Sequence, residues 1–420
     1  MAAPVRSCRV GAHTRVTVST YDVAIIGGGC IGLATARSLL DRGDLEVVVF
    51  EKEPELAQHQ SGRNSGVLHP GFNYEPGSLK AQFAVEGTRR MKQFAQVHDV
   101  PLDECGVLVV ATTERDETNL ERLFDRARAN GVDVERCDGH EAITAIEPHA
   151  AGRIGLWCPA AASIDSSSYI RALAAAVTDA GGEIRLDSTV SGLDVTSTGI
   201  RVETDGGPVS ATHVVNAAGL HADRIAHQLG VGSDVRIIPF RGEYYELRPE
   251  RRELTQTMIY PTPDPAIPFL GVHFTRRTDG SVIVGPNAVL ALGREAYRRR
   301  DVSLRDTASI LGYPGFWRLL ADRQVRQVAV QHLHTSLRKA AFVAQASRLV
   351  PSVTSVDLVR GHAGNRAQVV DRSGRLVMDP LVEAGPRSTH VLNAVSPGLT
   401  SSLPFGDHVA EQVVDRLDSA

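Results

Sequence analysis

A glycine-rich turn between two apolar segments places the tightest constraint on the fold of this chain. Residues 23–26 (VAII) form the first apolar segment, Gly27, Gly29 and Gly32 follow it in the pattern GxGxxG, and residues 47–50 (VVVF) form the second. In a βαβ unit the first glycine permits a tight turn, the second lets the backbone approach a pyrophosphate, and the third lets the helix pack closely on the sheet. The pattern therefore predicts a dinucleotide-binding unit at the N-terminal end of the fold.

Glu51 ends the second apolar segment, about 20 residues beyond the last glycine of the turn. A carboxylate at that place accepts hydrogen bonds from both hydroxyls of an adenosine ribose and repels a 2′-phosphate, which disfavours NADP. Backbone N–H groups and the dipole at the start of the helix favour a diphosphate. The alternative is a glycine turn that binds no ligand.

The composition of the chain indicates what kind of ligand it binds and where in the cell it works. The chain has 420 residues, enough for two or three folding units, and its formal net charge of −4 gives no basic field for nucleic acid, so a small molecule is expected. The five cysteines show neither CxxC pairs nor metal-like spacing, which predicts an intracellular, cytoplasmic protein without a bound metal. Because no apolar stretch is long enough to cross a bilayer, contact with the inner face of the cell membrane would be peripheral. Residues 1–20 are expected to form an N-terminal extension.

The order of the sequence patterns predicts an interleaved α/β architecture. After the first βαβ unit the chain leaves the dinucleotide pattern for a charged helix and strands, returns to it in an alanine-rich helix and a buried strand, and then enters alternating strands typical of an antiparallel sheet. We expect a Rossmann-like domain assembled from three segments and an α+β substrate domain, built on a mostly antiparallel sheet, assembled from two. The expected segments are 21–100, 156–235 and 350–420 for the first domain, and 101–155 and 236–349 for the second.

Three motifs along the chain resemble those of a known superfamily. The glycine turn, the strand end Asn216–Gly219 (NAAG) and the Pro-Gly loop 396–402 together resemble the FAD-dependent amine and hydroxy-acid oxidases related to D-amino-acid oxidase, the DAO superfamily. Within it, further strings resemble the L-2-hydroxyglutarate oxidase/dehydrogenase family, and the resemblance runs from about Tyr21 to the C-terminus. These strings are RNSGVLH (63–69), PFRGEY (239–244), PFLGVHF (268–274), GPNAVLA (285–291) and RAQ (366–368). The chain departs from relatives at Pro70, Asn73, His362 and Asn365, which bears on substrate selectivity.

The resemblance implies that the Rossmann-like domain is of the glutathione-reductase type and that its cofactor is FAD. The residues that it assigns to the cofactor come from the glycine turn, the acid strand end, the following polar loop, two later strands and the Pro-Gly loop. They are Gly27, Gly29, Cys30, Ile31, Gly32, Glu51, Lys52, Ser61, Asn64, Ser65, Gly66, Val190, Ala218, Gly219, Gly398, Leu399, Thr400 and Ser401. Residues 398–401 also begin a helix whose N–H groups would stabilise the negative charge of the reduced flavin.

The implied reaction is oxidation of L-2-hydroxyglutarate to 2-oxoglutarate by hydride transfer to flavin N5, with oxygen or a quinone as the final acceptor. It requires a base for the hydroxyl proton and anchors for two carboxylates. We expect His273 to be the base and His69 a second site histidine. Arg241 and Arg366 are expected to hold the carboxylates, with Tyr260 as a further donor. The alternatives are a solvated or core histidine, a surface Arg241 on a polar strand face, and a tyrosine that only packs in the core.

Other functions of a protein with these motifs stay open from the sequence. A related amine oxidase would use the same cofactor on sarcosine, glycine or a D-amino acid, and a silent FAD-binding module would bind flavin without reaction. An NAD-dependent enzyme is disfavoured because the second nucleotide-binding half does not follow the first. The sequence leaves the oligomeric state open.

Overall fold

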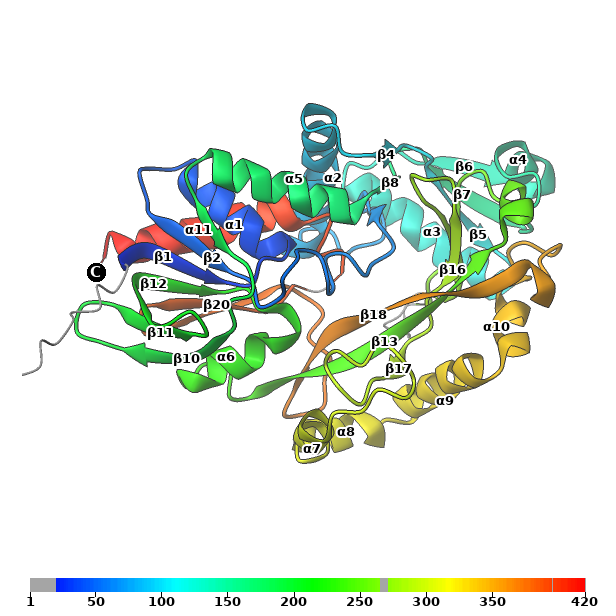
Figure 1. Cartoon of the computed structure of the whole chain (residues 1–420). Coiled ribbons are helices and arrows are strands. Elements are labelled where there is room, and N and C mark those ends of the chain that lie inside the picture. Colours follow the sequence, from blue (N-terminus) through cyan, green and yellow to red (C-terminus); the bar gives the residue numbers. More distant parts are fainter. Residues whose placement is uncertain (1–19, 265–270, 395, 420) are drawn as a thin grey trace, which may run out of the picture.

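Two large β-sheets organise the computed structural model, which describes residues 20–264, 271–394 and 396–419 (Figure 1). Most of the expected N-terminal extension, and residues 268–270 of the string PFLGVHF, therefore lie outside the described residues. The two sheets belong to two lobes, and the chain passes between them several times, as its colours show in Figure 1.

The first sheet has eight strands and holds the glycine turn. Its main path follows the order β10-β11-β12-β1-β2-β9, and β20 pairs with both β12 and β19. The strands are β1 (Thr20–Ile26), β2 (Val47–Phe50), β9 (Glu183–Arg185), β10 (Val190–Val195), β11 (Ile200–Thr204), β12 (Val209–Asn216), β19 (Leu381–Gly385) and β20 (Ser388–Asn393). The pairs β1–β2, β1–β12, β2–β9 and β12–β20 are parallel, as in a Rossmann-like domain.

Helices cover the parallel part of this sheet because their apolar stripes need burial. Helix α1 (Cys30–Leu40) packs between α5 (Ser166–Asp179) and α11 (Ser402–Leu417), and α2 (Leu79–Val97) packs on α11. Ile25, Leu33, Val49, Phe405 and Val409 are fully or almost fully buried in the shared core. On the other face, α6 (Ala222–Gln228) packs against β10 and β12.

The second sheet has nine strands in the order β17-β13-β16-β15-β14-β5-β7-β6, with β18 also paired to β13. All of its pairs are antiparallel except β14–β5. The strands are β5 (Val107–Ala111), β6 (Glu135–Asp138), β7 (Ile154–Cys158), β13 (Val235–Leu247), β14 (Met258–Pro261), β15 (His273–Arg276), β16 (Val282–Gly285), β17 (Val289–Leu290) and β18 (Leu358–Asp371).

Strand β5 shows how this sheet is buried on both faces. Val107 and Val109 pack with α3 (Glu114–Ala129), whereas Leu108 and Val110 pack with α4 (Gly139–Ile146) and α10 (Lys339–Ala346). Successive side chains of a strand point to opposite faces, so the all-apolar run VLVV serves two cores at once. Helices α7 (Leu304–Leu311), α8 (Pro314–Ala321) and α9 (Arg323–Leu337) lie along β13 and β18. A small sheet of β3 (Val67–Leu68), β8 (Ala162–Ile164) and β4 (Leu102–Asp103) lies between the lobes.

The α/β fold class with a Rossmann-like domain and a second, mostly antiparallel sheet is confirmed. At two places the strand pairing differs from the expected segments: residues 156–158 of β7 and 358–371 of β18 lie in the second sheet rather than in the first domain. The domain division itself stays a prediction. Among the described residues, the helices are too short or too polar to cross a bilayer.

Candidate active site at the junction of the two sheets

A cavity of about 720 Å³ lies where the glycine turn, the end of β12 and the strands β13 and β18 meet. This volume is within the range of small-molecule and cofactor sites. Its charged lining is mostly basic although the whole chain is slightly acidic, which suits an anionic ligand. The basic side chains are Lys52, Arg63, Arg224, Arg305 and Arg366, and the acidic ones are Glu51 and Glu295.

The glycines of the turn are required by close backbone contacts. A Cβ at Gly27, whose φ is +109°, would lie 2.5 Å from the carbonyl oxygen of Ala217, and a Cβ at Gly32 would lie 2.0 Å from the carbonyl oxygen of Gly27. At Gly29 the nearest atom to an added Cβ is Ser61 Oγ, at 3.0 Å. The first and third glycines therefore allow the turn and the helix packing, and the second keeps the N-terminus of α1 open to the cavity.

Glu51 and Ser61 hold the two sides of this turn. The Glu51 carboxylate accepts hydrogen bonds from the backbone N–H of Gly28 at 3.0 Å and of Glu53 at 3.1 Å, and Ser61 Oγ accepts one from Cys30 N–H at 3.0 Å. An ionised carboxylate offers about four lone-pair sites, so Glu51 keeps acceptor capacity for hydroxyl groups of a ligand.

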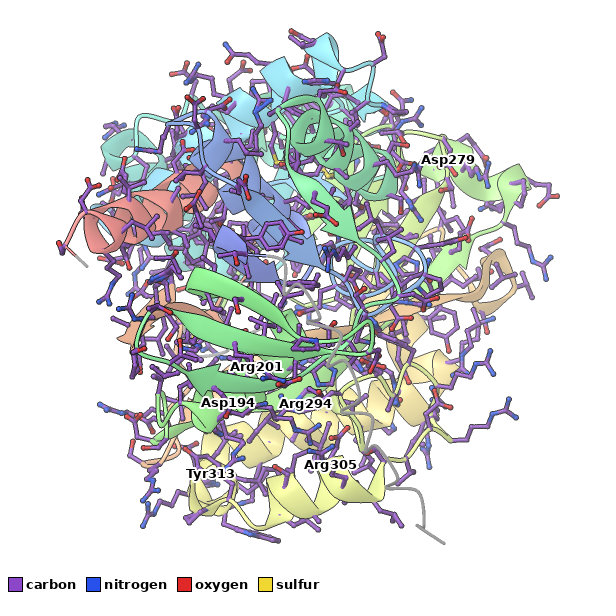
Figure 2. All side chains as sticks on the ribbon, turned by 60° about the vertical axis from the view of Figure 1, so that its left-hand side comes forward. Asp194, Arg201, Asp279, Arg294, Arg305 and Tyr313 are labelled. Carbon is purple, nitrogen blue, oxygen red and sulfur yellow. The ribbon has the colours of Figure 1, made fainter. Side chains whose placement is uncertain are left out.

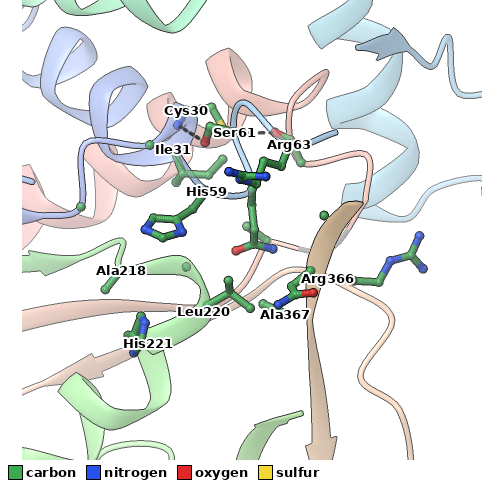
Figure 3. Close-up of a pocket in the computed structure, with 18 of the residues that line it drawn as sticks. Cys30, Ile31, His59, Ser61, Arg63, Ala218, Leu220, His221, Arg366 and Ala367 are labelled. Atoms are coloured by element: carbon green, nitrogen blue, oxygen red, sulfur yellow. Dashed lines mark hydrogen bonds between the residues drawn. The ribbon is translucent and has the colours of Figure 1, made fainter. Parts of the chain in front are cut away.

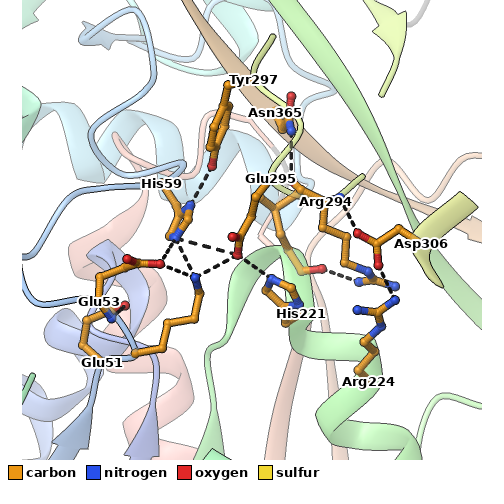
Figure 4. Close-up of polar contacts among 12 residues, drawn as sticks. Glu51, Glu53, His59, His221, Arg224, Arg294, Glu295, Tyr297, Asp306 and Asn365 are labelled. Atoms are coloured by element: carbon orange, nitrogen blue, oxygen red, sulfur yellow. Dashed lines mark hydrogen bonds and ion pairs between the residues drawn. The ribbon is translucent and has the colours of Figure 1, made fainter. Parts of the chain in front are cut away.

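Lys52 contributes to an ion-pair network at the edge of the cavity (Figure 4). Its ammonium contacts Glu53, Glu295 Oε1 at 2.8 Å and His59 Nε2 at 2.9 Å, and His221 Nε2 lies 2.8 Å from the same Glu295 oxygen. The His221 contact, with that of Lys52, lowers the pKa of Glu295 to about 2. Because it joins residues that follow β2 and β12 to Glu295, which follows β17, the network acts as a clasp between the lobes. The predicted absence of a metal ion stays a prediction.

Most of the residues predicted for the cofactor line this cavity. Those that do are Gly27, Gly29, Cys30, Ile31, Glu51, Lys52, Ser61, Asn64, Ser65, Val190, Ala218, Gly219, Gly398, Leu399 and Thr400. Gly32, Gly66 and Ser401 do not line it. Gly32 packs α1 on the turn, Gly66 has a φ of +72° and donates its N–H to Asn64 Oδ1, and Ser401 is the N-cap position of α11. These three residues do not contact the cavity but hold the backbone segments that line it.

The two predicted histidines lie at the same cavity. His273 begins β15, and its Nδ1 lies 2.8 Å from the carbonyl oxygen of Gly271. A carbonyl only accepts, so Nδ1 carries the proton and Nε2 keeps its lone pair. Burial lowers the pKa of His273 to about 4 and that of His69 to about 3. Both imidazoles are therefore neutral at physiological pH.

His69 is held by the loop that opens the last helix. Thr400 Oγ1 accepts a hydrogen bond from the backbone N–H of His69 at 3.1 Å and donates one to the carbonyl of Val67 at 3.1 Å. Thr400 is fully buried. The Pro-Gly loop is thus joined to β3 and the residue that follows it, which fixes the wall of the cavity on which His69 lies.

The predicted carboxylate anchors are placed differently. Arg366 lines the cavity and extends away from the α1 side of it (Figure 3), where burial lowers the pKa of its guanidinium. Arg241 does not line the cavity, and its role as a carboxylate anchor stays a prediction. Its guanidinium donates to Glu243 Oε1 at 3.2 Å and to the carbonyl of Arg298 at 3.1 Å. The reason is the alternation of β13, in which Phe240, Gly242 and Tyr244 face the cavity.

Tyr260 does not line the cavity either. Its ring packs on that of His273, with centroids 4.2 Å apart, and burial raises the pKa of its hydroxyl. Tyr260 therefore supports the His273 ring, and its role as a donor to the substrate stays a prediction. Sequence reasoning missed several lining residues, among them His59, Arg63, His221, Arg224 and Tyr244. Of these, Arg63 and Tyr244 had a usable signal, because each lies within one of the strings that resemble the family.

Comparison with known proteins identifies the family. The model of the family "FAD dependent oxidoreductase" (DAO) matches residues 22–412. The chain belongs to this family. It is 41% identical over 401 residues to the L-2-hydroxyglutarate dehydrogenase of Escherichia coli K12, covering 95% of this chain and 94% of that protein. It is 37% identical over 426 residues to the mitochondrial L-2-hydroxyglutarate dehydrogenase of Homo sapiens, covering 97% and 92%. The family resemblance found in the motifs is thus confirmed.

Solved structures of two other oxidases share the fold. L-α-glycerophosphate oxidase from Mycoplasma pneumoniae, solved with FAD bound, superposes with a TM-score of 0.74 at 24% identity, covering 95% of each chain. Glycine oxidase from Geobacillus kaustophilus superposes with a TM-score of 0.70 at 20% identity, also covering 95% of each. These likenesses confirm the two-lobed architecture.

The residues of this flavoprotein fit FAD. The glycine turn leaves no room for side chains against Ala217, the N-terminus of α1 opens on the cavity, and Glu51 has acceptor capacity left. Farther along, the buried Oδ1 of the cavity-lining Asn365 has no hydrogen-bond partner among the described residues, as expected where a ligand donates. The turn, Glu51 and Ser61 would hold the adenosine diphosphate, and Gly398, Leu399 and Thr400 the flavin end.

Proposed function

We propose that this protein oxidises L-2-hydroxyglutarate to 2-oxoglutarate with FAD. Full-length similarity to dehydrogenases named for that substrate supports the reaction, at 41% identity for the relative from E. coli K12. One observation carries the assignment of the base: a buried, neutral histidine whose tautomer is fixed lies on the same cavity as a cationic side chain. When bound, the flavin accepts the hydrogen and electron pair of the carbon that carries the hydroxyl.

His273 takes the hydroxyl proton in this proposal. Its Nδ1–H is held by the Gly271 carbonyl, so Nε2 is the nitrogen that accepts a proton, and no described residue hydrogen-bonds to it. The Tyr260 ring packed on it limits the orientation of the imidazole. A base that is already neutral and correctly oriented needs no proton loss before the reaction, and such a group contributes typically 10²–10⁴-fold to the rate.

Arg366 holds the carboxylate next to the reacting carbon. Strand β18 pairs with β13 so that Arg366 lies directly opposite Phe240 and Gly364 opposite Gly242. Residues directly opposite in an antiparallel pair share a face, which places Arg366 on the cavity side of the sheet. Its planar guanidinium can bind a carboxylate with two hydrogen bonds and so fix the orientation of the substrate. His69 completes this end of the cavity as a neutral polar group.

The electrons then pass to oxygen or to a quinone. Reoxidation by a quinone would require the protein to contact the inner face of the cell membrane from the cytoplasm. The two acceptors are separated by mixing the reduced enzyme with air-saturated buffer or, without oxygen, with a short-chain quinone. The faster return of the oxidised flavin spectrum identifies the acceptor.

An anaerobic titration with both enantiomers of 2-hydroxyglutarate tests the reaction. The L enantiomer should bleach the flavin absorbance and yield one equivalent of 2-oxoglutarate per flavin, whereas the D enantiomer, sarcosine, glycine and D-alanine should not. Bleaching by an amine alone would replace this proposal with an amine oxidase. A flavin that no member of the set reduces would indicate a silent FAD-binding module.

A further inference from the structure

Helix α9 carries an apolar stripe on the side that faces solvent. Val330, Leu333 and Leu337 are 66%, 51% and 65% exposed. Their spacing of three and four residues places the three side chains on one face of the helix. Single apolar side chains are common on protein surfaces, whereas an aligned set on one helix face indicates contact with another surface.

The opposite face of α9 already packs on the protein, so the stripe is not needed to hold the helix in place. Thr335 and Ser336 are 2% and 4% exposed, and Val325 packs against the apolar cluster formed by β13, β18, α7 and α8. Helix α9 lies along the outer edge of the second lobe in Figure 1. It therefore has two separate faces, one fixed to the lobe and one turned away from it.

The chain around the stripe is basic. Between Thr307 and Val356 the only acidic residue is Asp322, whose carboxylate accepts hydrogen bonds from backbone N–H groups at the start of α9. The same stretch contains six cations, although the whole chain has a formal net charge of −4. They are Arg318, Arg323, Arg326, Arg338, Lys339 and Arg348.

These cations are not neutralised by the protein. Within the described part of the chain none of the six forms an ion pair with a carboxylate, and Arg326 and Lys339 donate to backbone carbonyls. Arg323 and Arg326 lie about two turns and one turn before Val330, so they share the face of the stripe. This face of α9 therefore combines exposed apolar side chains with positive charge.

A bilayer surface with anionic headgroups has the chemistry that complements this face. The apolar side chains of an interfacial helix enter the boundary of the acyl chains, while its Lys and Arg side chains extend to the lipid phosphates. A second copy of the chain fits less well. A two-fold contact through the stripe would place the same cations near each other, with no acidic side chain on this face to pair with them.

We propose that the α9 face formed by Arg323, Arg326, Val330, Leu333 and Leu337 docks this protein on a bilayer that carries anionic headgroups. The proposal goes beyond the proposed reaction and does not depend on it. It assigns a binding surface and one class of partner to a helix that has no part in the cavity lining.

The inner face of α9 is joined to the wall of the cavity. His332 Nδ1 accepts a hydrogen bond from the N–H of the cavity-lining Ala288 at 3.2 Å, and Ser336 donates to Glu243 Oε2 at 2.7 Å. Docking through the outer face would therefore turn this side of the cavity toward the bilayer. Reoxidation by a quinone dissolved in the bilayer needs a contact of this kind.

Flotation of the holoenzyme with lipid vesicles tests the docking surface. Wild type should bind vesicles of equal parts phosphatidylglycerol and phosphatidylcholine, and added salt or phosphatidylcholine alone should weaken this binding. The triple variant Val330→Gln/Leu333→Gln/Leu337→Gln should bind about 10- to 100-fold more weakly, because three apolar side chains no longer enter the lipid. Arg323→Gln/Arg326→Gln should lower the affinity about tenfold at low salt.

Val97→Gln/Val195→Gln is the matched control. These side chains are 76% and 47% exposed and lie on α2 and β10, in the first lobe, so vesicle binding should stay at the wild-type level. The flavin spectrum and the thermal midpoint of each variant show that it is folded. Without vesicles, all variants should be bleached by L-2-hydroxyglutarate at the wild-type rate.

Three results would overturn the docking surface: no binding of wild type to the anionic vesicles, equal binding by the triple variant, or an equal loss in the control. Sedimentation velocity adds a fourth, because a dimer that dissociates only in the triple variant would assign the stripe to a second copy of the chain. If L-2-hydroxyglutarate does not reduce the flavin, the proposed function fails. Vesicle binding that depends on the stripe would still support the docking surface.

Discussion

His273 is the proposed base of the reaction. Its tautomer is set by a backbone carbonyl, its ring is packed against Tyr260, and burial keeps it neutral. His273→Ala should retain FAD, because the glycine turn and Glu51 are untouched, but should slow bleaching by L-2-hydroxyglutarate at least about 100-fold. Anaerobic stopped-flow absorbance measures both properties. Bleaching at the wild-type rate would remove His273 from the role of base.

The depressed pKa of His273 predicts the pH dependence of the same reaction. With a pKa of about 4 the imidazole keeps its lone pair from pH 7.5 down to pH 5.5, so the second-order rate of bleaching should be nearly constant over that range. A histidine of ordinary pKa would lose about tenfold in neutral form over the same interval. A tenfold fall in the wild-type rate would therefore show that this histidine is not buried and neutral in the free enzyme.

Sequence motifs predict which residues belong to the site better than they predict which residues surround them. His273, His69 and Arg366 were predicted from separate strings, and the structure brings them to one cavity. His221 had no such signal, because its partner Glu295 comes from the segment after β17, which is far from His221 in the chain. A sequence pattern describes one segment, whereas the charge around a side chain is the sum over all the segments that pack near it.

The sequence predicted strand β13 but not which of its faces lines the cavity or which strand pairs with it. Its alternating pattern was recognised, but the face of Arg241 was not, since Phe240, Gly242 and Tyr244 turn to the cavity and Arg241 turns to Glu243. The pairing of β18 along almost all of β13 was also missed, because alternation shows that a strand is half buried without showing which sheet it joins. The dinucleotide turn was predicted correctly because its three glycines and the acid that follows them lie within one short stretch of sequence, although Gly27 makes its close contact with Ala217, after β12.

The segment between β17 and α7 is tied to α6 by a buried ion pair. Arg294 donates two hydrogen bonds to Asp223, with side chains 3% and 0% exposed, and its backbone N–H donates to Asp306 at 2.8 Å. Arg294 lies between the green strands of the first sheet and the yellow helices in Figure 2. The pair thus fixes the segment that carries Glu295 to the cavity edge.

Arg294→Met should leave the Asp223 carboxylate buried without its partner and lower the free energy of unfolding by about 3–5 kcal/mol. It should also weaken FAD binding, because Glu295 loses its fixed position in the clasp with Lys52. Urea unfolding and flavin titration measure the two effects. Arg37→Met, which removes an exposed pair with Asp41, should cost at most about 1 kcal/mol. Equal decreases in the free energy of unfolding in both variants would show that the buried ion pair stabilises the fold no more than the exposed one.

For the whole molecule, burial of histidines couples stability to pH in both lobes. His213 and His390 lie in the first sheet and His273 in the second, each at most 5% exposed and each with a pKa lowered to about 4 by burial. His390 accepts from Asn216 at 3.1 Å and donates to Ser388 at 2.9 Å, which satisfies its neutral form. Between pH 6.5 and pH 4 these histidines bind protons in the unfolded chain but stay neutral in the folded chain. The free energy of unfolding therefore falls as the pH falls.

Each such histidine should remove up to about 2 kcal/mol of stability between pH 7 and pH 5. Since a typical domain has only about 5–15 kcal/mol in total, the protein should unfold steeply on mild acidification. His390→Asn keeps polar groups near Asn216 and Ser388 but cannot bind a proton, so its stability should fall less over this range than that of wild type. Urea denaturation of both proteins at pH 7 and pH 5 gives the comparison. Parallel losses would mean that His390 titrates alike in the folded and unfolded chain, and that the acid sensitivity of the fold lies in other groups.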